Sequence, residues 1–354
     1  MPPAEGAADA LRQLGWSPFF EAQLDAREHD ETVPGRVFAV ARSGVTVRTA
    51  AGSVDLPLGG RWFQYPPEDR PTIGDWVLLD RAGTVIERLL ERKSVLKRVA
   101  AGRDWEVQLI AANVDTVFLV TACNDEFNAS RLERYLALAV DAGVEPVVVL
   151  TKSDLADDVD PFVDTVRALK RDVPVEVVDA RDPATLEGVR SWCRAGQTVA
   201  LLGSSGVGKS TLVNSLSGDT VQLTREARED DAKGRHTTTG RSLHVLPGGG
   251  LLVDNPGMRE LGLADVDAGA LFDDVAALAA ECRFRDCRHE AEPGCAVQAA
   301  IADGRLDPRR LDSYRKLARD DARQSESTAQ SRARFRAFGK KIRQVKKDRD
   351  ERKG

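Results

Sequence analysis

The octapeptide Gly203-Ser204-Ser205-Gly206-Val207-Gly208-Lys209-Ser210 fits the pattern GxxxxGK[ST]. It follows the apolar run TVALL (198–202) and precedes a helical pattern that carries Leu212 and Leu216. In a strand–loop–helix unit, glycines let backbone N–H groups turn toward phosphate oxygens, and the helix N-terminus adds a partial positive charge. We therefore expect this loop to hold nucleotide phosphates. A glycine-rich structural turn is the alternative.

Residues at the end of this loop have separate chemical tasks. Lys209 is placed to reach the β- and γ-phosphates, and we also assign it a catalytic role. The hydroxyl of Ser210 is placed to bind Mg²⁺. The predicted nucleotide-binding set here is Gly203, Ser204, Ser205, Gly206, Val207, Gly208, Lys209, Ser210 and Thr211.

A second motif, Thr151-Lys152-Ser153-Asp154, directly follows the apolar run PVVVL (146–150) and indicates which base is bound. It resembles the [N/T]KxD guanine signature of GTPases. The Asp154 carboxylate can accept two N–H donors from guanine, whereas adenine offers no such pair on that edge. The stem of Lys152 can lie over the base. After the next apolar run, Val178-Asp179-Ala180 stands where GTPases often have Ser-Ala, so only Ala180 is carried over as a guanine contact.

Asp254-Asn255-Pro256-Gly257 ends another apolar run and resembles the DxxG motif. In that motif the aspartate holds Mg²⁺ through water and the glycine N–H meets the γ-phosphate, so Asp254 and Gly257 are predicted site residues. A plain β-turn is the alternative, because Asp, Asn, Pro and Gly all favour turns.

The order of the motifs is unusual, since the base loop at 151 precedes the phosphate loop at 203 and DNPG at 254. Most GTPases place the base loop last, so this order is circularly permuted. In an open parallel sheet, ligand loops all leave the carboxyl ends of the strands, so one pocket can form in any chain order. The segment after DNPG leads straight into the C-terminal region, which could receive a nucleotide-driven rearrangement.

Three of the five cysteines lie with a histidine within 14 residues, as Cys282-x4-Cys287-x-His289-x5-Cys295. A Cys₃His set suits tetrahedral Zn²⁺, and four filled positions favour a structural site. Cys123 and Cys193 fit the alternative of scattered buried thiols. We expect one zinc ion per chain. Three arginines interleaved with the ligands hint that this segment also faces phosphate: Arg283, Arg285 and Arg288.

Composition and the pattern of apolar residues divide the 354 residues into modules. Residues 1–32 have a helical, amphipathic pattern, 33–100 consist of short strand-like runs between glycines and prolines, and 101–265 alternate apolar runs with helical segments. Residues 266–323 carry the cysteines, and 324–354 form a basic tail. The net charge is −5, yet residues 332–354 carry +8, an asymmetry that suggests an acidic polymer as partner; a merely solvated tail is the alternative.

Taken together, the permuted order, the β-rich N-terminal module, Gly234-Arg235-His236-Thr237-Thr238-Thr239 and the cysteine cluster resemble the ribosome small-subunit-dependent GTPase A family over about residues 33–323. The resemblance implies a multidomain protein with an N-terminal OB-fold β-barrel, an α/β circularly permuted P-loop GTPase domain and a C-terminal α-helical zinc-binding domain. It also implies late maturation of the 30S subunit: the GTP form docks on 16S rRNA, and hydrolysis stimulated by the subunit drives release.

The GRHTTT segment lies where the first GTPase switch belongs. One of its threonines is expected to bind Mg²⁺, and we choose Thr238 within the triplet. Met258 follows DNPG where Ras-like enzymes have a water-positioning glutamine. His236 is the nearest candidate to orient the water, and the resemblance favours it. A switch histidine that contacts RNA, or nothing, is the alternative, with the catalytic group then supplied by the ribosome.

The sequence also bears on the cellular compartment and on the class of protein. It has no run of about 20 apolar residues and no secretory signal at its start, so we expect a cytoplasmic protein without membrane contact, and a monomer. Three rivals to a GTPase remain open. They are an ATPase of the same loop class, an RNA-binding assembly module whose nucleotide site switches but hardly turns over, and an OB protein with a vestigial GTPase domain.

Overall fold

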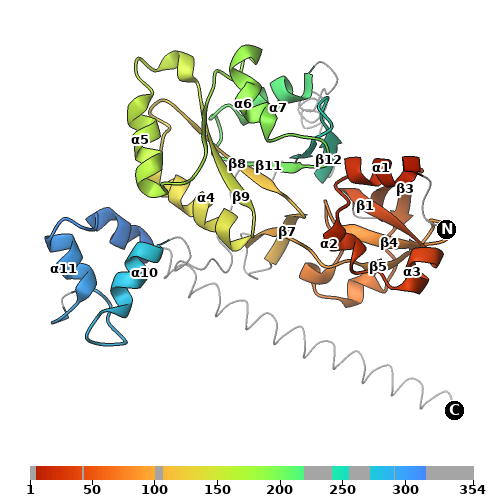
Figure 1. The fold of residues 1–354 in the computed structure, drawn as a ribbon, viewed down its shortest axis with the longest axis horizontal. Coiled ribbons are helices and arrows are strands. Elements are labelled where there is room, and N and C mark those ends of the chain that lie inside the picture. Colours follow the sequence, from red (N-terminus) through yellow and green to blue (C-terminus); the bar gives the residue numbers. More distant parts are fainter. Residues whose placement is uncertain are drawn as a thin grey trace, which may run out of the picture. The chain divides into compact units, whose positions relative to one another are not determined.

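The computed structural model describes residues 5–41, 44–99, 107–218, 241–254, 272–290 and 292–315. They fall into two compact units (Figure 1). The first holds the described residues within Met1–Arg98, Gln108–Ala129 and Ala142–Leu261, and the second holds those within Val99–Val107, Ser130–Asp141 and Gly262–Gly354. Among the described helices, none combines the length and the apolar character needed to cross a bilayer.

The N-terminal segment forms three short helices, α1 (Glu5–Gln13), α2 (Pro18–Glu21) and α3 (Ala26–Glu31). Their apolar positions Leu11, Leu14 and Phe20 are buried, and Phe20 lies with Trp76 of the β-module at a ring distance of 5.7 Å. Asp25 begins α3 with a reciprocal capping box to Glu28. The predicted helical segment is therefore present as a cover on the β-module.

The β-module contains five antiparallel strands, as expected for an OB-fold. Strand β1 pairs with both β2 and β4, β2 pairs with β3, and β4 pairs with β5. Alternate side chains enclose a core around Val37, Val47 and Val77, each fully buried. The elements are β1 (Thr32–Val40), β2 (Gly44–Thr49), β3 (Gly52–Pro57), η1 (Trp62–Gln64), η2 (Pro67–Asp69), β4 (Trp76–Asp80) and β5 (Ile86–Leu89).

The sheet of the GTPase domain has the order β10-β9-β8-β11-β13-β12. The first five strands are parallel and β12 is antiparallel. All seven residues of β8 are buried, as expected for a strand covered on both faces. The strands are β8 (Thr116–Ala122), β9 (Glu145–Thr151), β10 (Val175–Val177), β11 (Thr198–Leu202), β12 (Arg241–Val245) and β13 (Leu251–Asp254); β6 (Val95–Val99) and β7 (Val107–Ala112) pair separately.

Helices α6 (Glu187–Ser191) and α7 (Lys209–Ser217) pack on this sheet through Val189, Leu212 and Leu216 (Figure 1). Within the described residues between β9 and β11 lie three more helical elements, η3 (Ser153–Leu155), α5 (Asp160–Leu169) and η4 (Pro183–Leu186). The mixed sheet, with the phosphate loop directly after β11, confirms the predicted α/β P-loop class.

The β-module and the GTPase sheet are continuous, which the sequence did not indicate. Ala39 and Val40 of β1 pair with Ser242 and Arg241 of β12, so that one sheet of eleven strands runs through both. Arg36, only 1% exposed, reinforces this junction by donating to the carbonyls of Leu14, Gly74 and Asn113. One side chain thus ties the N-terminal helices, the β-module and the GTPase domain together.

The second unit contains α4 (Ala129–Asp141), α10 (Asp273–Ala280), α11 (Ala296–Ala302) and a helix over 308–315. Phe272 is buried and meets the ring of Tyr314 at 5.8 Å. Arg310 forms a two-pronged ion pair with Asp274, with both nitrogen–oxygen distances at 2.7 Å. These contacts hold the described helical part of the C-terminal domain together around the cysteine segment.

Candidate functional site

The phosphate loop joins β11 to α7, as its motif predicts. Gly206 and Gly208 have φ of 86° and 93°, a region that favours glycine; Gly208 is a fixed glycine of the pattern, whereas Gly206 stands at one of its variable positions. Ser205 and Gly206 are exposed, so the crest of the loop faces solvent. The ammonium of Lys209 donates to the carbonyl of Gly203 at 2.6 Å and to that of Ser204. Lys209 is therefore already directed into the concave side of the loop.

Thr151 connects the phosphate loop with the base loop. It ends β9 fully buried, and its Oγ1 lies 3.0 Å from the carbonyl oxygen of Thr121 and 2.5 Å from that of Val207. The hydroxyl therefore bridges the ends of two strands and the phosphate loop. Thr151, predicted as a nucleotide ligand, holds the two ligand-binding loops in register.

The base loop turns sharply at Lys152, which has φ of 57°. The ammonium of Lys152 lies 3.0 Å from Oε2 of Glu126, a residue in the loop after β8. Asp154 is the middle residue of η3, and 27% of its side chain is exposed. Its Oδ2 accepts a hydrogen bond from Nη2 of Arg181 at 2.6 Å. Both motif residues thus have protein partners that the sequence reasoning did not find.

Arg181 directly follows the predicted guanine contact Ala180, the one signal that could have singled it out. Its backbone N–H and its Nε both donate to Oδ1 of Asp179, at 3.0 and 3.2 Å. Both hydrogen bonds lower the pKa of the Asp179 carboxyl, and the bond from the backbone N–H contributes most. Ala180 itself is 5% exposed, and its carbonyl accepts from the hydroxyl of Ser215 on α7 at 2.6 Å.

The remaining predicted nucleotide contacts are only partly within the described residues. The backbone of Asp254 ends β13, where Val253 pairs with Ala200 of β11, so it lies beside the strand that leads into the phosphate loop. Ser210 lies in the first turn of α7 and is half-buried. His236, Thr238 and Gly257 lie outside the described residues. The same is true of the basic tail, 324–354.

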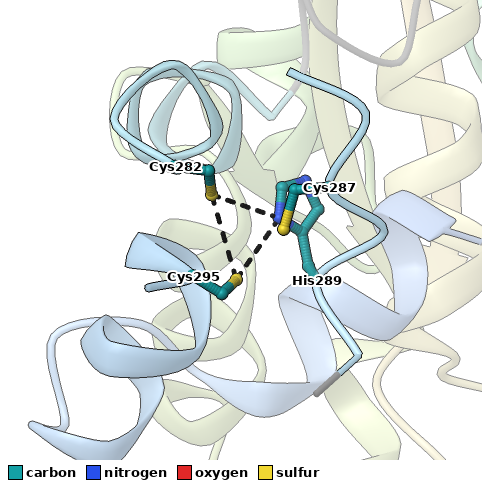
Figure 2. A group of neighbouring side chains, drawn as sticks. All are labelled: Cys282, Cys287, His289 and Cys295. Atoms are coloured by element: carbon teal, nitrogen blue, oxygen red, sulfur yellow. Dashed lines mark hydrogen bonds between the residues drawn. The ribbon is translucent and has the colours of Figure 1, made fainter. Parts of the chain in front are cut away.

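The four predicted zinc ligands come together in the second unit (Figure 2). Sγ of Cys282 lies 3.9 Å from Sγ of Cys295, and both sulfurs lie 3.5 Å from Nδ1 of His289. Cys287 completes the group, in which all four ligand atoms lie within 4.8 Å of one another. A tetrahedron with Zn–S of about 2.3 Å and Zn–N of about 2.05 Å separates two sulfurs by about 3.8 Å and sulfur from nitrogen by about 3.5 Å. The side chains therefore fit tetrahedral zinc.

The protein around this cluster favours the ligating form of its histidine and fixes how the ligands are presented. Burial, with Arg315 nearby, lowers the pKa of His289, so its imidazole is neutral at physiological pH, as ligation requires. The carbonyl of His289 accepts from Gln298 and from Arg315, which fixes the backbone that presents the ring. Cys295 caps α11, with its Sγ accepting from the N–H of Gln298 at 3.4 Å. Helix ends and a tight loop thus orient the ligands.

Comparison with known proteins gives a consistent picture. A family model described as RsgA GTPase matches residues 89–264. Small ribosomal subunit biogenesis GTPase RsgA 2 of Vibrio parahaemolyticus is 50% identical over 347 residues, covering 98% of this chain and 95% of that protein. Small ribosomal subunit biogenesis GTPase RsgA of Mesorhizobium japonicum is 48% identical, covering 92% of this chain and 93% of that protein.

Solved structures agree with these matches. The crystal structure of YjeQ from Thermotoga maritima superposes with a TM-score of 0.63 at 27% identity and covers 82% of this chain and 99% of its own. YloQ, described as a circularly permuted GTPase, superposes with a TM-score of 0.59 at 24% identity, covering 85% of this chain and 99% of its own, and supports the fold alone. The predicted fold class and the family resemblance are both confirmed.

Proposed function

This chain belongs to the RsgA GTPase family, and from that premise we propose that it hydrolyses GTP as a late-stage maturation factor of the 30S ribosomal subunit. One observation carries the proposal: a phosphate loop and a TKSD base loop meet at one edge of one sheet, joined through the hydroxyl of Thr151. This arrangement supports guanine nucleotide binding because it presents phosphate-binding amides after β11 and a base-reading carboxylate after β9, the two strands that flank β8.

In this proposal the loop of residues 203–211 cradles the phosphates, and Lys209 exchanges the carbonyls of Gly203 and Ser204 for phosphate oxygens. Asp154 reads the guanine edge, with Lys152 over the base and the N–H of Ala180 toward its carbonyl. Ser210, Thr238 and Asp254 would hold Mg²⁺, which supplies charge neutralisation to the phosphates. Oxygen ligands from the start of α7 and the end of β13 suit this ion.

His236 orients the attacking water, and Gly257 contributes its N–H to the γ-phosphate. The absence of a glutamine after DNPG, where Met258 stands, supports slow intrinsic hydrolysis. The GTP form docks on 16S rRNA in the small subunit, the subunit accelerates hydrolysis, and the GDP form leaves. The Cys₃His set holds one structural Zn²⁺, and the protein acts as a cytoplasmic monomer.

The test is GTP turnover by the purified full chain with and without 30S subunits, at matched Mg²⁺ concentration. We expect stimulation by the subunits, preference for GTP over ATP, and no stimulation in Lys209→Ala. Turnover unchanged by 30S subunits would favour a nucleotide-switched RNA-binding module, and preference for ATP would replace the GTPase assignment by an ATPase.

The base assignment has its own test, Asp154→Asn. The amide donates where the carboxylate accepts, so specificity should shift from guanine toward xanthine nucleotides. Competition binding with GTP, XTP and ATP measures the shift. Unchanged guanine preference in the variant would contradict the role of Asp154.

A further inference from the structure

We propose that Arg181 is an internal competitor for the guanine-reading carboxylate, so that it tunes nucleotide affinity and exchange by occupying Asp154 until a guanine base displaces it. The observation is the 2.6 Å hydrogen bond from Nη2 of Arg181 to Oδ2 of Asp154. This inference rests on the proposed function, because it concerns the same base site.

The chemistry of the two groups makes them rivals. Guanine offers the carboxylate two neighbouring N–H donors, from N1 and the exocyclic amine. A guanidinium likewise presents planar N–H donors suited to a carboxylate, with a full positive charge that strengthens each bond. Each carboxylate oxygen has two lone pairs, and in this proposal the guanidinium takes the one on Oδ2 of Asp154 that the base needs, so the two exclude each other.

The surroundings of Arg181 permit the exchange. Its side chain is 67% exposed, so moving it requires no repacking of a core. Asp179 remains as a second partner, bonded to its backbone N–H and to Nε at 3.0 and 3.2 Å. The hydroxyl of Thr185 also donates to the carbonyl of Asp179 at 2.9 Å, which fixes that turn. Asp179 therefore keeps the guanidinium beside the site after it leaves Asp154.

Competition of this kind has a defined kinetic signature. A base can bind only the fraction of molecules in which Asp154 is available, so the apparent Kd equals the intrinsic Kd divided by that available fraction. Exposed ion pairs are weak, and the corresponding occupancy lowers affinity by about two- to fivefold. The effect appears in the association rate, since the competitor acts before the base is bound. An arginine whose main role is to contact the bound base would instead slow dissociation.

The experiment is stopped-flow binding of mant-GDP to the wild-type chain, Arg181→Ala, Arg181→Lys and Arg171→Ala, at constant ionic strength. Arg171 is an exposed arginine outside the base loop and controls for loss of one positive charge. We expect Arg181→Ala to raise the association rate constant about two- to fivefold with little change in dissociation. The association rate constant of Arg181→Lys should lie between those of the wild type and Arg181→Ala, because the lysine ammonium keeps the charge but lacks the planar guanidinium.

An unchanged or lower association rate in Arg181→Ala, or a faster dissociation with weaker binding, would overturn the inference while leaving the wild-type protein a guanine nucleotide binder. Failure of the wild-type chain to bind mant-GDP would instead remove the proposed function. A second readout is amide hydrogen exchange of the first unit without nucleotide. Outside the 178–181 turn, Arg181→Ala should keep wild-type protection, which separates the effect on the association rate from misfolding.

Discussion

The nucleotide-binding loops and the Cys₃His cluster are assembled in opposite ways. The loops come from the ends of β9, β10, β11 and β13, which are spread over about a hundred residues, and their charged side chains have exchangeable partners: Lys209 on loop carbonyls and Asp154 on Arg181. The cluster comes from residues 282–295 alone, and its four ligand atoms already lie within 4.8 Å of one another, three of them at tetrahedral spacing. A site that must bind and release is built on replaceable bonds, whereas a site that holds structure is preformed.

The largest expected effect comes from removing a ligand of the preformed site. Cys287→Ser leaves three ligands, and structural zinc contributes binding energy of order 10 kcal/mol to folding in small domains. We expect bound zinc, measured by elemental analysis, to fall below about one per chain and the second unit to lose its thermal transition. Nucleotide binding by the first unit should remain.

The matched control for this variant is Cys193→Ser, which alters a buried thiol outside the cluster. Burial raises the pKa of Cys193 to about 12, so it is a thiol at physiological pH, and it is not among the four clustered ligands. Zinc content should be unchanged in that variant. Equal zinc in wild type and Cys287→Ser would refute the assignment of the cluster.

A second variant tests whether the first unit depends on a buried charge in the way the second depends on metal. Arg36→Met removes the donor to the carbonyls of Leu14 and Asn113, whereas the carbonyl of Gly74 keeps a second donor, Nδ2 of Asn113 at 3.0 Å. Each of the two orphaned buried carbonyls costs about 1–3 kcal/mol, so we expect a loss of about 2–6 kcal/mol in the free energy of unfolding by urea.

Arg48→Met is the comparison for Arg36, because Arg48 is a half-buried arginine of the same module, stacked 4.3 Å from the ring centroid of Phe38. Its loss should cost less than about 1 kcal/mol. If both variants unfold at the same urea concentration, Arg36 does not join the modules energetically.

The smallest effect is expected at the link between the two loops. Thr151→Val keeps the shape but removes the hydroxyl between the carbonyls of Thr121 and Val207, which should lower stability by about 1–2 kcal/mol. Guanine nucleotide affinity, measured by titration with mant-GDP, should fall by less than tenfold. Thr165→Val, whose hydroxyl donates to the Pro161 carbonyl on an exposed helix, should change neither quantity appreciably. Equal effects from both substitutions would exclude a linking role for Thr151.

Much of this molecule is predictable because its motifs are local. The GxxxxGK[ST] loop places glycines where φ is positive, and the spacing of the cysteines and His289 is enough to predict a metal cluster. The apolar runs at 146–150 and 198–202 predicted β9 and β11 to within a residue, since a doubly covered strand has to be apolar. The partners of Lys152 and Asp154 were not predictable, because Glu126 and Arg181 lie 26 and 27 positions away.

The amino-acid sequence alone defines which groups are available: the backbone amides of a glycine-rich loop, the carboxylate of the TKSD motif, and three thiols and an imidazole within 14 residues. How these parts are connected depends on the folded chain. It joined β1 to β12 in one sheet, buried Arg36 among three carbonyls, and paired Asp154 with Arg181. The reason is physical: residue type and local spacing fix what a short segment can bind, whereas strand pairing and ion pairs between distant segments depend on which surfaces the folded chain brings together.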